Sequence, residues 1–239
     1  MSLETTATIQ NDAPEPSAAD KAILEEMSKA GILYGRKKSK TNPKMRPFIL
    51  ATRSGVEIFD LPQTQEAAAR AQEAIRQLKE KKSKIMLVGT QPAVRDLIKE
   101  LAVKLEAPFV VERWLGGTFT NFQTLSQRIR YYTKLKADRA AGKLDKYTKK
   151  ERLNFDKEIA RMDKLFGGLE KLDKLPDLLF IVDAELKNHK TAVEEAKKLN
   201  IPVMAILNSD NNPEKIQYPI PGNSNARSSV QWVLNKIFA

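Results

Sequence analysis

Three aspartates, each placed directly after a predicted strand, are the residues best suited to chemistry. Asp60, Asp183 and Asp210 all follow short apolar runs. Ligands of open α/β sheets bind beyond the carboxyl ends of the strands, so three carboxylates converging there could hold Mg²⁺ or take part in phosphoryl transfer. The alternative is structural: Asp60 and Asp183 cap the following helices, and Asp210 begins an Asn- and Pro-rich turn. The absence of an Asp-x-Asp pair favours the structural alternative.

Other catalytic chemistry has little support in the composition. The chain has no Cys and one His, which excludes a disulfide framework, a thiolate nucleophile and a cysteine-ligated zinc site. His189 lies between Lys187 and Lys190, so we expect a solvated surface side chain. The turn at 89–92 lacks the glycine pattern of dinucleotide-binding or P-loop sites. We therefore predict no catalytic residue, no metal site and no cofactor.

The elements that would position these residues alternate between strands and helices. This order predicts βαβ units, and therefore an α/β domain with a mainly parallel sheet and helices on both faces, formed by 21–119 and 167–239. The apolar runs predict strands at 48–51, 56–59, 85–88, 109–111, 178–182 and 203–207, and the helical periodicity predicts helices at 22–30, 62–81, 92–105, 188–199 and 226–238.

The segment 120–166 interrupts this alternation. Its apolar residues recur in steps of three and four, which predicts two helices that meet along a narrow coiled-coil seam. Ala141-Gly142 breaks the pattern, and Thr148 with Glu151 matches a capping box. We expect an inserted antiparallel helical hairpin with arms on the order of 30 Å long.

Positive charge is concentrated in two segments of the chain. The formal net charge is +11, while 120–166 carries 13 basic against 6 acidic residues, and 36–46 carries six basic residues and no acidic one. The charges of the hairpin are as compatible with a solvated helix face as with a binding surface. Six like charges within 36–46, however, repel one another without a counter-charge, so we expect an exposed loop that contacts phosphates.

The remaining features predict a cytoplasmic protein. Residues 1–20 are acidic, with Pro and small polar side chains, and we expect a disordered tail. The sequence contains no run of 18 apolar residues and no signal-peptide pattern in its first 20 residues, so we expect no association with membranes.

The junction between the sheet and the hairpin is the most specific stretch of the sequence. It reads Arg113-Trp114-Leu115-Gly116-Gly117-Thr118-Phe119-Thr120-Asn121-Phe122. Chemically it predicts a helix start, with flexible glycines, a capping Thr118 or Thr120 and buried aromatic rings. As an ordered string it resembles the signature of the bacterial ribosomal protein S2 family. Further matches are Thr41-Asn42-Pro43-Lys44-Met45-Arg46, Leu87-Val88-Gly89-Thr90, Phe166-Gly167-Gly168-Leu169 and Tyr218-Pro219-Ile220-Pro221-Gly222-Asn223.

This resemblance implies a flavodoxin-like sheet with a coiled-coil hairpin, no catalysis, and a place between the head and body of the small ribosomal subunit. It implies contacts with small-subunit rRNA and with ribosomal proteins, including the large mRNA-capturing protein, rather than a homo-oligomer. The chain departs from the family where Gly-x-x-Phe-Gly-His is usual, because position 36 is Arg. That puts a metal site involving the His in doubt. The RNA-binding residues we predict are Arg36, Lys37, Lys38, Lys40, Asn42, Lys44, Arg46 and Arg113.

Overall fold

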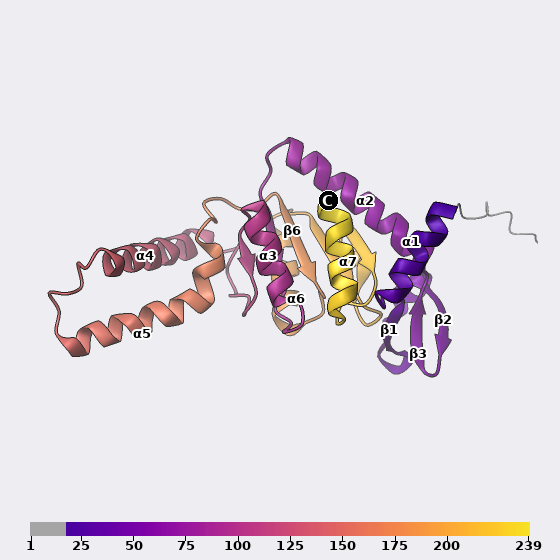
Figure 1. The fold of residues 1–239 in the computed structure, drawn as a ribbon, viewed down its shortest axis with the longest axis horizontal. Helices are drawn as coiled ribbons and strands as arrows, with labels where there is room; N and C mark the ends of the chain where they lie inside the picture. The colour runs from indigo at the N-terminus through magenta and orange to yellow at the C-terminus, as the bar shows by residue number, and fades with distance from the viewer. Residues whose placement is uncertain (1–17) are drawn as a thin grey trace, which may run out of the picture.

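The structure, a computed structural model, describes residues 18–239 (Figure 1). Of the predicted tail, 1–17 lies outside the described residues, and 18–20 begins the first helix. No helix of the described part is both long and apolar enough to cross a membrane. The elements are α1 (Ala18–Lys29), β1 (Tyr34–Lys37), β2 (Ile49–Arg53), β3 (Val56–Phe59), α2 (Leu61–Glu80), β4 (Ile85–Val88), α3 (Arg95–Leu105), β5 (Phe109–Val110), α4 (Phe122–Ala140), α5 (Lys149–Phe166), β6 (Leu178–Val182), α6 (Lys187–Lys198), β7 (Val203–Leu207), β8 (Tyr218–Pro221) and α7 (Arg227–Phe238).

A five-stranded parallel sheet forms the centre of the molecule. Its order is β5-β4-β6-β7-β8, which corresponds to 2-1-3-4-5 in chain order and is consistent with a flavodoxin-like fold. Every residue of β4, β6 and β7 is buried, because helices cover both faces. The predicted parallel sheet is therefore confirmed. β1, β3 and β2 form a separate antiparallel sheet.

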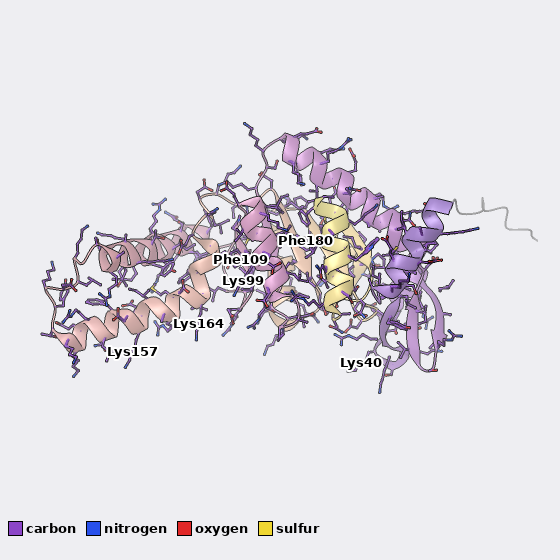
Figure 2. All side chains as sticks on the ribbon, in the orientation of Figure 1. Lys40, Lys99, Phe109, Lys157, Lys164 and Phe180 are labelled. Atoms are coloured by element: carbon purple, nitrogen blue, oxygen red, sulfur yellow. The ribbon has the colours of Figure 1, made fainter. Side chains whose placement is uncertain are left out.

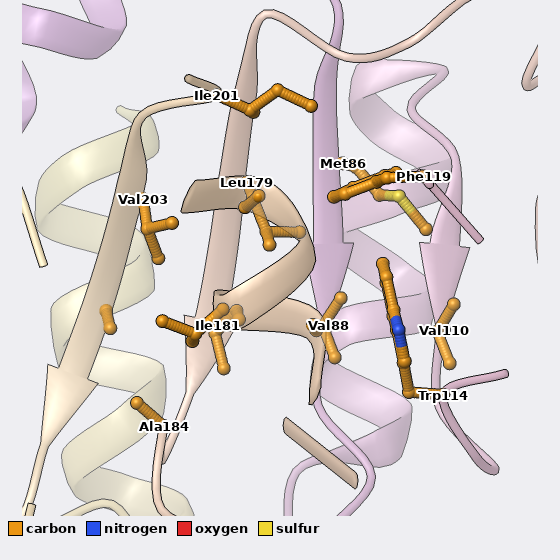
Figure 3. Packing of buried hydrophobic residues seen from close by; sticks show 14 of the residues in the cluster. Met86, Val88, Val110, Trp114, Phe119, Leu179, Ile181, Ala184, Ile201 and Val203 are labelled. Carbon is orange, nitrogen blue, oxygen red and sulfur yellow. The ribbon is translucent and has the colours of Figure 1, made fainter. Parts of the chain in front are cut away.

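Two hydrophobic clusters occupy the two faces of the parallel sheet. One contains Met86, Val88, Leu179 and Ile181 with apolar residues of α6, and it extends to Trp114 and Phe119 at the base of α4 (Figure 3). The other contains alternate residues of the same strands, covered by α2, α3 and α7. The strands are continuously apolar because each side chain enters one cluster or the other.

Strand β8 is an element that the sequence prediction missed. The predicted strands do not include its segment, which is rich in Pro, Gly and Asn, and Pro219 and Pro221 have no N–H to donate. β8 pairs only with β7, at the edge of the sheet, where alternate residues need no donor. Proline is therefore compatible with this strand.

Helices α4 and α5 lie side by side and project from the end of the sheet opposite to β1–β3 (Figure 1). Buried Tyr132 and Leu135 of α4, together with Met162 and Phe166 of α5, supply apolar contacts at the predicted steps. The capping box at Thr148 is present.

Candidate functional site

The basic segment 36–46 is more ordered than the expected loop. Arg36 and Lys37 belong to β1, and two short 3-10 helices, Lys38–Lys40 and Pro43–Phe48, follow. Met45 is fully buried and fixes the second of them to the core. The prediction of a loop is wrong for most of this segment. Six basic residues give no hydrophobic pattern, and a single apolar residue, Met45, is too weak a signal to predict the turn of helix that it anchors.

Only part of the charge in this segment is free of internal ion pairs. Arg36 lies 3.7 Å from Asp183 and 3.5 Å from Asp210, and Lys44 pairs with Glu214. The other four basic residues, Lys37, Lys38, Lys40 and Arg46, are exposed and form no ion pair within residues 18–239.

The two remaining predicted RNA-binding residues differ in environment. The Asn42 side-chain oxygen accepts a hydrogen bond from the Lys44 backbone N–H at 3.0 Å, and the Asn42 backbone N–H donates to the Ser209 carbonyl at 2.8 Å. Asn42 therefore holds the backbone of the segment. Arg113 is exposed, precedes the junction and has no ion pair in the described chain.

Asp183 lies at the carboxyl end of β6, beside the point where the strand order reverses. It is 1% exposed and has a positive φ of 67°, a conformation that needs support from its surroundings. Its carboxylate accepts hydrogen bonds from four groups, at 2.9 to 3.2 Å: the side chains of Gln91, Asn211 and Ser224 and the Glu185 amide. At the position where such folds usually bind ligands, the Asp183 carboxylate is thus hydrogen-bonded to groups of the chain itself.

Arg36 supplies the positive charge of this cluster. Burial and the neighbouring Asp210 raise the pKa of Asp183, whereas the hydrogen bonds of Ser224 and the Glu185 amide and the charge of Arg36 act in the opposite direction. The guanidinium also donates to the Asn225 side chain at 3.2 Å. No group of three His, Cys, Asp or Glu residues suited to a metal ion occurs within 18–239.

The three aspartates do not come together as the phosphotransferase alternative would require. Asp60 follows β3, in the other sheet, and accepts a hydrogen bond from Gln63 at 2.8 Å. The capping prediction is also wrong: the Asp60 side chain makes no capping bond to the backbone of α2, and α6 begins after Leu186, beyond the reach of Asp183 as its N-cap. Asp210 lies in the predicted turn after β7.

His189 is fully buried, so the prediction of a solvated side chain is wrong. Its Nδ1 lies 2.7 Å from the Asp183 carbonyl oxygen and its Nε2 lies 3.1 Å from the Thr90 hydroxyl. A carbonyl can only accept, so Nδ1 donates and Nε2 accepts from Thr90. Burial lowers the pKa of His189, which favours this neutral form. The imidazole fastens α6 to the ends of β4 and β6.

The junction is organised by a residue that sequence reasoning missed. Glu195 of α6 is 5% exposed, and its carboxylate accepts from the amides of Gly117, Phe119 and Thr120 at 2.8 to 3.2 Å. It also accepts from the Trp114 indole at 3.2 Å and the Thr120 hydroxyl at 3.3 Å. A single acid within a helix carries no sequence signal for this role.

The junction prediction is only partly confirmed. Gly117 has φ +90°, as expected of a flexible glycine, and the Trp114 and Phe119 rings meet edge to face at 4.9 Å. Neither threonine caps α4, because the Thr118 hydroxyl donates to Leu115 and Thr120 is bound to Glu195.

Unpaired positive charge is most abundant on α4, α5 and their connection. Of the 13 basic residues in 120–166, Lys136, Arg139, Lys143 and Arg152 form ion pairs. The other nine are exposed and form none with any described residue: Arg128, Arg130, Lys134, Lys146, Lys149, Lys150, Lys157, Arg161 and Lys164.

Together, the flavodoxin-like sheet and the projecting helices rich in unpaired cations define an α/β protein with a strongly positive surface, which is the kind of surface that nucleic-acid-binding proteins have. The chain belongs to the ribosomal protein S2 family, whose model matches residues 27–239. This family is structural and non-enzymatic, so the phosphotransferase alternative has no support.

Individual members of the family align with the chain over most of their length. The chain is 36% identical to small ribosomal subunit protein uS2 of Coprothermobacter proteolyticus, over 90% of this chain and 79% of the relative. It is 38% identical to uS2 of Roseiflexus castenholzii, over 91% and 80%. It is 35% identical to uS2c of Cyanophora paradoxa, over 90% and 91%.

Proposed function

We propose that the protein is a structural constituent of the small ribosomal subunit, where it binds small-subunit rRNA and neighbouring ribosomal proteins and so supports translation. The observation that carries this proposal is the family match over 27–239. The relatives cited above are named as small-subunit proteins. The protein acts in the cytoplasm, on the ribosome, as a single copy, and its neighbours include the large mRNA-capturing protein.

The charge distribution supports rRNA as a partner. Cations without intramolecular partners are available to phosphates, and each contact releases counterions from the RNA. In the basic segment, Lys37, Lys38, Lys40 and Arg46 serve this role together with Arg113. Arg36, Lys44 and Asn42 chiefly shape the segment, because their polar groups already have partners in the chain.

The proposal includes the domain organisation of the chain. Residues 21–119 and 167–239 form the α/β domain, and 120–166 is an antiparallel coiled-coil hairpin inserted between them. The burial of Tyr132, Leu135, Met162 and Phe166 supports a seam between the two helices. Such an insertion lets one protein contact RNA from two separated surfaces.

Sucrose-gradient fractionation of cells that carry an epitope-tagged copy tests this function. We expect the tagged chain to comigrate with small subunits and to dissociate when high salt strips proteins from rRNA. A chain found only in the free protein fractions, at normal expression and with small subunits present, would overturn the proposal. Changing Asp60, a residue of the phosphotransferase alternative, to Asn should leave comigration unchanged.

A further inference from the structure

A groove lies where the end of α5 meets the edge of the parallel sheet. It has a volume of about 320 Å³ and is lined by residues of α3, of β5 and the turn after it, and of the α5 end, with Lys99 and Lys164 among them. Gly168 allows the close approach of these elements, because a Cβ at this position would lie 2.2 Å from the Phe109 carbonyl oxygen. The groove therefore brings together lysines from two separate helices.

The carboxylates of this groove are already engaged within the chain. Glu112 pairs with Arg95 at 3.1 Å, and Asp163 accepts a hydrogen bond from the Tyr132 hydroxyl at 2.5 Å. Burial, the bond to Asp163 and nearby Glu170 raise the pKa of Tyr132, so its hydroxyl remains a donor. Both lysines, in contrast, form no ion pair within residues 18–239. An incoming anion would meet cations without having to displace a carboxylate from them.

Helix α5 extends this positive surface away from the sheet. Lys157, Arg161 and Lys164 are separated by four and three residues, so they lie on one side of the helix and cover about 10 Å of its length. All three are exposed and have no ion pair in the described chain. Figure 2 shows Lys157 and Lys164 in succession along α5, towards Lys99 on α3.

We propose that these four residues, Lys99, Lys157, Arg161 and Lys164, form a phosphodiester-binding track with the groove at its inner end. This inference rests on the proposed function, because rRNA is the polyanion. Four unpaired cations along one line exceed what a small anion needs, whereas successive phosphates of one RNA strand can engage them together. The track differs from the basic segment 36–46, which lies at the other end of the molecule (Figure 1).

The test is binding of the full-length chain to a transcript of small-subunit rRNA over a series of salt concentrations. In the track variant, Lys99, Lys157, Arg161 and Lys164 are changed to Gln. The matched control changes three lysines and one arginine that are exposed and unpaired on α2, just after it, and on α6: Arg70, Lys81, Lys197 and Lys198. Circular dichroism and thermal unfolding confirm that both variants are folded.

The slope of log affinity against log salt is negative, and we expect the track variant to reduce its magnitude by roughly 3 units, at about 0.7–0.9 per lost phosphate contact. The control should change the slope by less than about 1 unit. Equal slopes for the two variants would overturn the track. Wild-type binding no stronger than to an unrelated RNA of equal length would instead overturn the proposed function itself.

The chain contains no Cys, so a single introduced thiol can be labelled specifically. A Lys99→Cys chain carrying an iron chelate and assembled into small subunits should cleave the rRNA backbone locally by hydroxyl radicals. The same label at Lys197→Cys should not give those cuts. If only the Lys197 position produced cuts, or neither did in assembled subunits, the groove would not lie against RNA.

Discussion

Replacing Glu195 by Gln should destabilise the protein strongly, although the change is nearly isosteric. One oxygen of the carboxylate accepts from Trp114 and Gly117, and the other accepts from Phe119 and from both donors of Thr120. A glutamine amide has one oxygen and one NH₂ group. Whichever way it is oriented, at least two N–H donors lose their acceptor and face another donor.

The size of the loss follows from these bonds. A hydrogen bond to a charged group contributes about 1.5–3 kcal/mol, so two lost bonds imply about 3–6 kcal/mol of unfolding free energy. That is a large share of the stability of a typical domain, on the order of 5–15 kcal/mol. The matched control is Glu194→Gln, one residue earlier and exposed, which should change stability by less than about 0.5 kcal/mol.

The pH dependence provides a second readout of the same variant. Burial by itself would raise the pKa of Glu195, but the amides of Phe119 and Gly117, the Trp114 indole and the Thr120 amide outweigh it, so the pKa lies below its ordinary value of 4.5. Because the Glu195 pKa is lower in the folded than in the unfolded protein, the ionised carboxylate stabilises the fold above the unfolded-state pKa. This stabilisation is lost as the pH falls through the folded-state pKa. The difference in unfolding free energy between wild type and variant should therefore be largest at neutral pH and shrink below pH 4.5.

Urea denaturation followed by circular dichroism and Trp fluorescence measures this difference at pH 7 and in the acid range. A Glu195→Gln effect below about 1 kcal/mol at pH 7, or one that stays constant at acid pH, would show that the carboxylate does not hold the junction.

Three further results are expected. Gly168→Ala should lower the unfolding free energy by about 1–3 kcal/mol in urea denaturation, because its Cβ would overlap the Phe109 carbonyl; wild-type stability would contradict the close approach. Hydrogen exchange of the free protein should be much faster in α4 and α5 than in β4, since their seam is narrow; equal protection would contradict this. Changing the four unpaired cations of the basic segment, Lys37, Lys38, Lys40 and Arg46, to Gln should reduce the magnitude of the slope of log rRNA affinity against log salt by roughly 3 units. An unchanged slope in a folded variant would show that these side chains are merely solvated.

Local sequence patterns are sufficient to predict most of the helices and the inner strands of the parallel sheet. β4, β6 and β7 were found with their observed bounds because each is a short, continuously apolar run buried on both faces. The capping box at Thr148 was found because its two partners are three residues apart. These features depend on neighbours in the sequence.

The site could not be predicted in the same way, because its partners are far apart in the sequence. Arg36 meets Asp183 and Asp210 only when β1 docks against the parallel sheet. His189 looked solvated because of its lysine neighbours, yet it occupies the side of α6 that faces the sheet. Glu195 lies on the same helix, and its partners are 75 to 81 residues away.

Because Glu195 fixes the hairpin at its base, a change in length at the far end would leave the contacts of the junction unchanged. The connection at 141–148 touches neither the parallel sheet nor the junction, and the helix after it begins with its own capping box. Inserting one turn into each helix would move the tip about 5.4 Å outward and leave the base in place. The distance that the hairpin reaches from the sheet is thus set by the length of its two helices, independently of the structure of the sheet.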